Sequence, residues 1–402
     1  MNMRGKTYLR RGALLAGAGL AAALAFFATP LTTQAQEKPP LTLATMGNFF
    51  VGGAYDTQEP GHMFGQMYAE YYIPQNRTHP YPIIMVHGGS VTGAGWLETP
   101  DGREGWAQYF LRRGYAVYVV DQVARGRAPY HDEVLGKRSY QTLQFVRERF
   151  ANKGKFPLWP QAKLHTQWVG EPVPGDPSFD QYWASNIPSM EDRGRQVQMN
   201  IDALVQLLDK VGPSIVLVHS QSGVYPWTAA QKRPDLVKAI VAIEPSGPPV
   251  HDIEFHGAPN WFTEVAATKT FGIQDVPVEY APAATAQSPL QFVQQEQPNA
   301  PDLVRCWRQK EPAKKLVGLD RPILIMQSEA SFYASYNHCT VEYMVQAGVK
   351  PTHIRLQDVG IHGNGHMMMM ERNSDQVAQV VVDWLQKSLA GAEAAERGRA
   401  RP

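Results

Sequence analysis

The 402-residue chain is short of cysteine, of net charge and of long apolar runs, and each shortage excludes a class of function. Its 38 basic and 37 acidic residues leave a formal net charge of +1, which argues against a nucleic acid or an anionic membrane bound through bulk electrostatics. No apolar run beyond Phe27 is long enough to span a bilayer. No Gly-x-Gly-x-x-Gly or P-loop pattern follows an expected strand, and we find no internal repeat.

Cysteine and histidine offer no metal site either. The two cysteines, Cys306 and Cys339, lie outside any nucleophile or metal-binding motif. In an oxidising compartment they can form a disulfide, and two buried free thiols are the alternative. The 12 histidines do not form a ligand set, because the closely spaced His362 and His366 lack a third ligand nearby. We therefore expect no metal and no cofactor.

Residues 1–35 have the layout of a signal peptide. Basic side chains within Arg4–Arg11 precede the apolar segment Gly12–Phe27, and Thr33–Ala35 offers a small-residue cleavage site. The Arg10–Arg11 pair favours twin-arginine export, and an ordinary Sec signal with two chance arginines is the alternative. We expect a periplasmic or secreted protein that has no membrane span once the signal is removed.

The most informative stretch of the chain is Ser214–Gly223, an apolar, β-branched run that ends in small residues. A helix-compatible segment, Val224–Gln231, follows at once. This order is typical of a nucleophile elbow, in which a sharp turn between strand and helix holds one serine in a strained, exposed position. A buried strand that simply ends in a polar turn is the alternative.

Two serines compete for the nucleophile position of this elbow. Small residues are needed two positions before and two after the nucleophile, because the strand and the helix nearly touch there. Ser220 as nucleophile places Val218 and Ser222 at those positions. Ser222 as nucleophile would place Val224 after it and Gly223 at the wrong offset. We therefore favour Ser220.

A glycine-rich loop follows another buried-type strand, Pro82–Val86, and reads His87–Ser90. In α/β-hydrolases a loop of this kind supplies one oxyanion donor, and the residue after the nucleophile supplies the other. The expected donors are the backbone N–H groups of Gln221 and Gly89. With the strand Tyr115–Asp121, the order of elements predicts an α/β-hydrolase fold, a mostly parallel sheet with helices on both faces.

A catalytic base is expected near the C-terminal end of the chain, in a loop after the last strand. The segment Gly360–Met367 lies before an amphipathic helix expected over Ser374–Leu389, and it offers two histidines. His366 follows a glycine and precedes an apolar run, which is the usual context of such a base. His362 is the alternative and would otherwise pack or support the loop.

Two glutamates compete for the acid that would orient the histidine. Glu244 follows the apolar strand after the elbow, and Glu329 follows the next one, Ile323–Gln327. Either carboxylate could fix the imidazole tautomer and stabilise the imidazolium. The residue pattern by itself leaves Glu244 and Glu329 even.

The domain expected over residues 36–390 carries two long insertions, at about 130–190 and 246–312. Both exceed an ordinary connection and contain many aromatic residues. In hydrolases such insertions form a cap or lid over the catalytic face, which here indicates an apolar acyl or aryl pocket. The alternative is that these aromatic side chains only pack the insertions onto the core. The charged, alanine-rich tail 391–402 is expected to be disordered.

These motifs together resemble those of a family of secreted bacterial esterases found in Alcaligenes and its relatives. The matching segments span the expected hydrolase core and are His87–Gly93, Trp96, Thr99–Arg103, Gly105–Trp106, Tyr109–Arg112, Asp121–Gln122, Arg125–Arg127, His219–Gly223, Glu244–Pro245 and His362–Met369. The resemblance implies Ser220 as nucleophile, Glu244 as acid and His366 as base, and so favours Glu244 over Glu329. Two departures concern the pocket: Gly89–Ser90 stands where the Alcaligenes relative has cysteines, and the stretch 246–315 is longer than expected.

The sequence therefore predicts an exported serine carboxylic-ester hydrolase that acts through an acyl-enzyme on a small-molecule ester. An amidase, a lactonase or a polyester depolymerase would use the same residues. A non-catalytic binding protein on a hydrolase scaffold is a further alternative. The sequence leaves room for a homodimer and gives no sign of a nucleic-acid partner.

Overall fold

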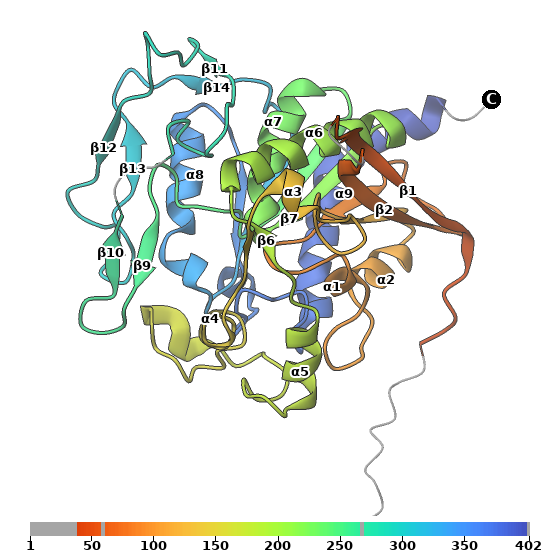
Figure 1. The fold of residues 1–402 in the computed structure, drawn as a ribbon, viewed down its shortest axis with the longest axis horizontal. Coiled ribbons are helices and arrows are strands. Elements are labelled where there is room, and N and C mark those ends of the chain that lie inside the picture. Colours follow the sequence, from red (N-terminus) through yellow and green to blue (C-terminus); the bar gives the residue numbers. More distant parts are fainter. Residues whose placement is uncertain (1–37, 58–60, 266–268, 400–402) are drawn as a thin grey trace, which may run out of the picture. The chain divides into compact units, whose positions relative to one another are not determined.

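The central element is an eight-stranded sheet in the part of the chain from Leu41 onward (Figure 1). The computed structural model describes residues 38–57, 61–265 and 269–399, so the expected signal peptide lies outside the described residues. Across the sheet the strands follow the order β1 (Leu43–Tyr55), β2 (Met63–Pro74), β4 (Val117–Asp121), β3 (Ile83–Val86), β7 (Ser214–His219), β8 (Val237–Ile243), β15 (Ile323–Gln327) and β16 (Thr352–Arg355). The pairs β1–β2 and β2–β4 are antiparallel, and every other pair in this sheet is parallel.

The inner strands are buried on both faces because their sequences are apolar throughout. Every residue of β3, β7 and β15 is buried. Alternate side chains enter different cores: Ile83 and Met85 belong to one apolar cluster, and Ile84 and Val86 belong to the other. This is the pattern expected of a parallel sheet that helices cover on both sides.

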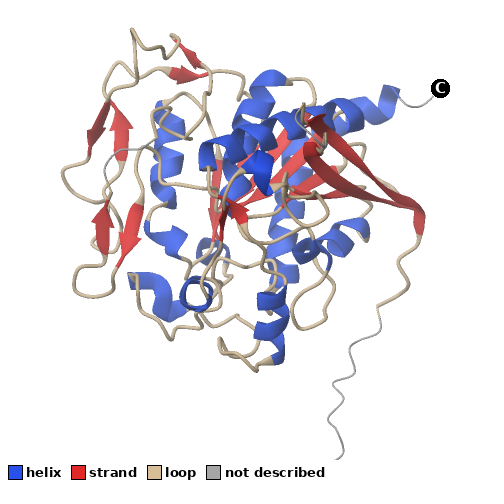
Figure 2. Cartoon of the chain, in the orientation of Figure 1, coloured by secondary structure: helices blue, strands red, loops and turns tan. Residues whose placement is uncertain are grey.

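Helices cover the two faces of the sheet, as Figure 2 shows. One cluster receives the buried sides of α2 (Trp106–Leu111) and α9 (Ser374–Arg399), and the other receives those of α6 (Arg193–Val211), α7 (Tyr225–Lys232) and part of α8 (Asn337–Gln346). The predicted α/β-hydrolase architecture is therefore confirmed.

The first insertion fills the chain between β4 and α6. Its elements are α3 (Asp132–Leu135), β5 (Arg138–Ser139), α4 (Leu143–Arg149), the 3₁₀ helix η1 (Pro160–Leu164), α5 (Pro177–Ala184) and β6 (Ser189–Met190). Several of its aromatic side chains are fully buried in the same apolar cluster as α2 and α9, among them Trp159, Trp168 and Phe179. For these residues the packing interpretation holds.

The second insertion consists of three small antiparallel ladders, grouped at the left of Figure 1. They pair β9 (Ile253–Phe255) with β10 (Phe262–Glu264), β11 (Tyr280–Ala281) with β14 (Lys315–Leu316), and β12 (Phe292–Gln294) with β13 (Trp307–Gln309). A disulfide joins Cys306, next to β13, to Cys339 of α8. Of the two alternatives for the cysteines, the disulfide is the one observed.

The C-terminal helix is longer than the sequence analysis predicted. Helix α9 begins at Ser374 as expected but continues to Arg399 instead of ending near Leu389, so the described part of the tail 391–402 is helical rather than disordered. The tail is rich in alanine, glutamate and arginine, which are strong helix formers and continue a helix already begun. Among the described residues, no helix is both long and apolar enough to cross a membrane.

Candidate active site

Ser220 occupies the turn between β7 and α7. Its φ of +56° lies in the left-handed region, which a residue with a side chain adopts only under strain. The chain then makes one 3₁₀ turn, η2 (Ser220–Val224), before α7 begins. The strained backbone agrees with the elbow motif, but Ser220 is half-buried in the lining of a cavity rather than exposed.

The tight approach in this elbow falls at a different residue from the one expected. We expected it at Ser222, but a Cβ atom added to Gly223 would overlap the Cα atom of Pro245. The 3₁₀ turn after Ser220 brings Gly223, rather than Ser222, against the chain that leaves β8. Ser222 is instead a buried brace, whose Oγ donates to the Val86 carbonyl at 3.0 Å and accepts from the His219 N–H at 3.1 Å.

His366 lies between Ser220 and Glu244. Its Nε2 is 2.9 Å from Ser220 Oγ, and its Nδ1 is 2.6 Å from a carboxylate oxygen of Glu244. The ring stacks on Tyr333 at a centroid distance of 4.6 Å and on Phe150 at 5.4 Å. Because these aromatic rings pack against the imidazole and Glu244 binds Nδ1, Nε2 is directed at Ser220.

Glu244 is fully buried at the end of β8 and is surrounded by donors. Its Oε1 accepts from the Ser328 N–H at 2.9 Å and from Ser328 Oγ at 2.6 Å, and its Oε2 accepts from Ser331 Oγ at 2.7 Å. Burial raises the pKa of Glu244, and these donated hydrogen bonds offset only part of that rise. A carboxylate that only accepts is the form that these neighbours satisfy.

Burial also sets the protonation of the histidine. It lowers the pKa of His366 to about 3, although the nearby Glu371 carboxylate acts in the opposite direction. The imidazole is therefore neutral at ordinary pH. With Nδ1–H donated to Glu244, its Nε2 can accept the proton of the Ser220 hydroxyl.

The alternative residues lie together, but away from this chain of hydrogen bonds. Glu329 accepts from the N–H of Gly363 at 2.8 Å and lies 3.1 Å from Nδ1 of His362. The His362 side chain is 63% exposed. The structure thus brings Ser220, His366 and Glu244 together. Glu329 and His362 instead contact each other, and Glu329 holds the loop at Gly363.

The two expected oxyanion donors line the same cavity as Ser220 and His366. The preceding glycine, Gly88, lies so close to the elbow that an added Cβ would come within 2.9 Å of Nδ1 of His219. Gly89 in turn faces the side chain of Gln221. Glycine is needed in this loop because its backbone passes directly over the elbow.

The cavity beside Ser220 has a volume of about 400 Å³ and is lined by both apolar and polar side chains. The apolar ones include Phe145, Phe150, Phe332, Tyr333 and Met367. The polar ones include Ser139, Gln141, Ser189, Glu191 and Arg193. The first insertion contributes residues of both kinds, so part of it borders the cavity beside Ser220.

Three side chains at or beside the site were not singled out as functional from the sequence. Tyr333 stacks on His366, and its hydroxyl lies 3.4 Å from Ser220 Oγ. Arg125 is fully buried beside Gly88 and Gln221. Phe150 also stacks on the imidazole, at a centroid distance of 5.4 Å. The resemblance covered Arg125, but Tyr333 and Phe150 reach the site only through folding, so no local sequence pattern marks them.

The first insertion is tied to the loop that carries His366. His165 Nδ1 accepts from the Lys153 N–H at 3.1 Å, so its Nε2–H donates to Glu371 at 2.6 Å. Glu371 also accepts from the Gly365 N–H at 2.9 Å. The backbone N–H groups of residues 166 and 167 donate to the Gly363 carbonyl at 2.9 and 3.1 Å.

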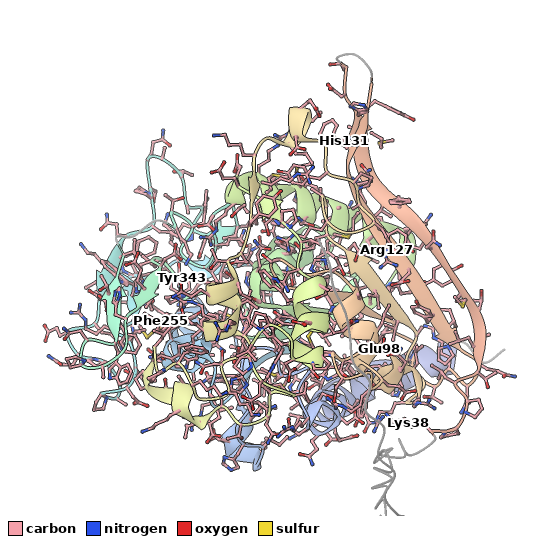
Figure 3. All side chains as sticks on the ribbon, turned by 60° about the horizontal axis from the view of Figure 1, so that its bottom comes forward. Lys38, Glu98, Arg127, His131, Phe255 and Tyr343 are labelled. Atoms are coloured by element: carbon pink, nitrogen blue, oxygen red, sulfur yellow. A yellow bond between two sulfur atoms is a disulfide. The ribbon has the colours of Figure 1, made fainter. Side chains whose placement is uncertain are left out.

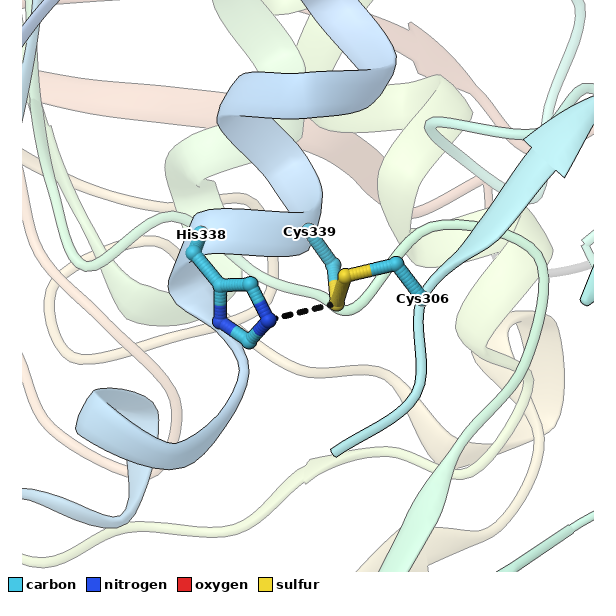
Figure 4. A group of neighbouring side chains, drawn as sticks. All are labelled: Cys306, His338 and Cys339. Carbon is cyan, nitrogen blue, oxygen red and sulfur yellow. Dashed lines mark hydrogen bonds between the residues drawn. A yellow bond between two sulfur atoms is a disulfide. The ribbon is translucent and has the colours of Figure 1, made fainter. Parts of the chain in front are cut away.

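Among the described residues, one group of three side chains has the spacing of a metal site, and it consists of Cys306, His338 and Cys339 (Figure 4). The two sulfur atoms are joined in the disulfide, and His338 Nε2 lies 3.5 Å from the Cys339 sulfur. Because a disulfide offers no thiolate ligand, this group does not fit a metal ion.

Comparison with known proteins agrees with this geometry. The alpha/beta hydrolase family matches residues 83–380. A protein named "Probable secreted lipase phiG", from Fungal sp. (strain ATCC 74256), is 40% identical over 352 residues, which cover 84% of this chain and 89% of that protein. A solved structure of a novel bacterial esterase superposes with a TM-score of 0.58 at 24% identity, over 88% of this chain and 98% of that one, and so shares the fold. The protein described here belongs to the alpha/beta hydrolase family.

Proposed function

We propose that this protein is a serine hydrolase that cleaves carboxylic esters through an acyl-enzyme. The observation that supports the proposal is the unbroken line of hydrogen bonds from Ser220 through His366 to the buried Glu244. Nucleophile, base and acid in this order activate a serine for acyl transfer. The name of the fungal relative agrees with ester chemistry.

In the proposed acylation, Ser220 Oγ attacks the ester carbonyl carbon while His366 Nε2 takes the hydroxyl proton. The carbonyl oxygen becomes an oxyanion, which the backbone N–H groups of Gln221 and Gly89 bind. When the carbonyl re-forms, the bond to the alcohol oxygen breaks and the leaving group takes the proton from His366. Glu244 holds the imidazole orientation and stabilises the imidazolium.

Deacylation repeats these steps with water in place of the serine. The water attacks the acyl carbon and gives its proton to His366, and the oxyanion forms against the same two N–H groups. On collapse the bond to Ser220 Oγ breaks, and Oγ recovers the proton from His366. The products are a carboxylic acid and the free enzyme.

The cavity supports a small or apolar ester as the substrate. A volume of about 400 Å³ is within the usual range for small-molecule sites. The aromatic side chains that line the cavity, such as Phe150 and Phe332, would favour an apolar acyl or aryl group.

The test has two parts. A fluorophosphonate probe should label the purified protein with a stoichiometry of about one, and peptide mapping should place the adduct on Ser220. A panel of esters of varied acyl and alcohol length, with matched amides and lactones, should then show ester turnover that exceeds amide turnover. No labelling and no turnover would support a non-catalytic binding protein, and faster amide, lactone or polyester turnover would change the bond that is assigned.

We also propose that the protein is exported. The signal-peptide pattern within residues 1–35 and the word "secreted" in the name of the fungal relative support this proposal. Fractionation of cells that produce the full chain should recover activity in the periplasm or the medium. Replacement of Arg10–Arg11 by two lysines should retain the protein in the cytoplasm if export uses the twin-arginine route, and should leave Sec export intact.

A further inference from the structure

Arg125 is a buried cation that joins the two loops of the proposed oxyanion site. Its side chain donates to the Gly88 carbonyl at 2.8 Å, to Oε1 of Gln221 at 2.6 Å and to Oγ of Ser189 at 2.6 Å. The residue is 1% exposed, and among the described residues it forms no ion pair. Burial lowers its pKa only to about 10, so the guanidinium is charged at neutral pH.

Burying a charge without a counter-ion costs free energy, so an arginine kept in such a place indicates a role there. The neighbouring Arg127, labelled in Figure 3, is an ordinary contrast: it forms ion pairs with Glu70 and Asp121 at 2.9 and 2.8 Å. Arg125 instead binds a backbone carbonyl, an amide oxygen and a hydroxyl. Because no carboxylate neutralises it, the positive charge of Arg125 can interact with a negative charge that forms nearby during the reaction.

The Gly88 carbonyl is held by more than Arg125. His87 Nε2 accepts from the Gln122 N–H at 3.1 Å, so His87 Nδ1–H donates to the Gly88 carbonyl at 2.8 Å. In a planar trans peptide the carbonyl and the following N–H point in opposite directions. Fixing the Gly88 carbonyl toward Arg125 therefore fixes the N–H of Gly89 on the opposite side of the same peptide.

The second donor is held by the same guanidinium. Gln221 follows Ser220 directly, and its side-chain oxygen accepts from Arg125. One rigid, planar group thus sets the position of two segments that are far apart in sequence and carry the two expected N–H donors. Arginine suits this task because its donors have a fixed planar arrangement, whereas lysine offers a point charge on a flexible stem.

We propose that Arg125 is a positioning residue for the oxyanion, which aligns the N–H groups of Gly89 and Gln221 and adds a buried positive charge beside them. The proposal rests on the proposed ester hydrolysis. Since the negative charge develops only in the tetrahedral state, Arg125 should stabilise that state and not the bound ester.

The experiment compares Arg125→Gln, Arg125→Lys and the wild type on the best ester of the panel. We expect Arg125→Gln to lower kcat about 100-fold, the loss typical of a missing oxyanion donor, with KM within about three-fold of the wild type. Arg125→Lys keeps the charge without the planar guanidinium, so its kcat should be about ten-fold higher than that of Arg125→Gln and still below that of the wild type. The affinity for phenylboronic acid, which forms a tetrahedral adduct with the serine, should fall in proportion to kcat.

Arg321 offers a control for the replacement of an arginine that donates to backbone carbonyls. It is half-buried, and it also donates to backbone carbonyls, those of Val237 and Gly318, near the opposite ends of the strands. Arg321→Lys should lower thermal stability without changing kcat or boronate affinity. If Arg125→Gln does not fold, Gln221→Ala is the alternative, because it removes the hydrogen bond from the Arg125 guanidinium to Oε1 of Gln221. This variant should lower kcat by about three- to ten-fold, again without raising KM.

Three results would overturn the inference. They are an unchanged kcat in the folded Arg125 variants, a loss seen in KM alone, or a boronate affinity that stays constant while kcat falls. Each would leave Arg125 with a structural role. Failure of the proposed function is distinct from these, because the wild-type protein itself would then neither react with the fluorophosphonate nor hydrolyse any ester.

Discussion

Two residues with strained backbones stand at the ends of neighbouring parallel strands. Ser220 has a φ of +56° after β7, and Glu244 has a φ of +42° after β8. Such conformations cost on the order of 1–3 kcal/mol each and persist only where the surroundings hold them. Here the Ser220 carbonyl accepts from the Ser246 N–H at 2.9 Å, and the Glu244 N–H donates to the Met326 carbonyl at 2.9 Å. We interpret the strain as the means by which both side chains are directed at His366.

The nucleophile assignment predicts unequal effects at the two serines of the elbow. Ser220→Ala should reduce kcat by about a million-fold while the protein stays folded, as the loss of a triad nucleophile does elsewhere. Ser222→Ala is the matched control and should keep most of the activity. It should also cost on the order of 1–3 kcal/mol of stability, because the buried Val86 carbonyl and His219 N–H lose a partner. Acylation of Ser222 in a trapped intermediate would show that the assignment is wrong.

The acid assignment predicts a similar contrast between the two glutamates. Glu244→Gln should lower kcat about a thousand-fold or more, because the amide can donate to Nδ1 and hold the wrong imidazole tautomer. Glu329→Gln should cost about ten-fold or less, since Glu329 only supports the loop through Gly363 and His362. Steady-state kinetics on one ester decide the ranking, and a more severe loss at Glu329 would reverse the assignment.

The burial of His366 predicts activity in acid. Protonation of the imidazole removes the acceptor for the serine proton, so kcat/KM falls as the pH drops through the pKa of the free enzyme. Because burial lowers that pKa below its usual value of about 6.5, the acid limb should lie below pH 6.5. A profile of kcat/KM from pH 3 to 9, with unfolding followed by circular dichroism, tests this. An acid limb centred near 6.5 would mean that the site is more hydrated than its packing indicates.

At the scale of elements, the sequence predicts those helices, strands and turns that show as a pattern of consecutive residues. The buried strands β3, β7 and β15 show as short apolar runs, and the elbow shows as a strand followed at once by a helix. The three ladders of the second insertion were not predicted, because their strands have two or three residues and pair across long loops.

The candidate site shows the same division. Ser220 and His366 stand in recognisable local contexts, so their positions could be predicted from the pattern of residues. The choice of Glu244 over Glu329 needed the resemblance, because both follow a strand and only the packing brings Ser328 and Ser331 around one of them. Tyr333 could not be found at all, since its contact with His366 depends on η3 (Phe332–Ser335) lying against a loop distant in sequence.

The disulfide supplies a prediction at this scale. Cys306 and Cys339 close a loop with a sequence separation of 33, so its removal should cost about 3–4 kcal/mol by the loop-entropy argument. The double variant Cys306→Ser, Cys339→Ser should show that loss in urea unfolding while kcat changes little, because neither residue lines the cavity. The single variant Cys306→Ser is the control for the serine itself. An unchanged unfolding midpoint would show that the packing of β13 on α8 suffices alone.

At the scale of the whole molecule, the first insertion and the core share one packed interior. The first insertion packs Trp159 and Phe179 into the same cluster as the sheet, and Phe255 of the second insertion, labelled in Figure 3, lies edge-on to Trp159 at 6.0 Å. Arg125 links Ser189 of the first insertion to the loop of Gly88. The parts of the chain that line the cavity are thus joined to one another by packing and hydrogen bonds.

The hydrogen bonds between residues 165–167 and the loop 363–371 have a kinetic consequence. If the first insertion moved away from the core, the buried hydrogen bond between His165 and Glu371 would break, and the loop that holds His366 would lose a support. His366 would then no longer be held in place beside Ser220. The enzyme should therefore meet its substrate as single dissolved molecules and not wait for an oil–water interface. Its rate on a short-chain triglyceride should saturate smoothly below the solubility limit, without a jump when droplets appear. A sudden rise at that limit, absent in a His165→Ala variant, would instead identify a movable cover.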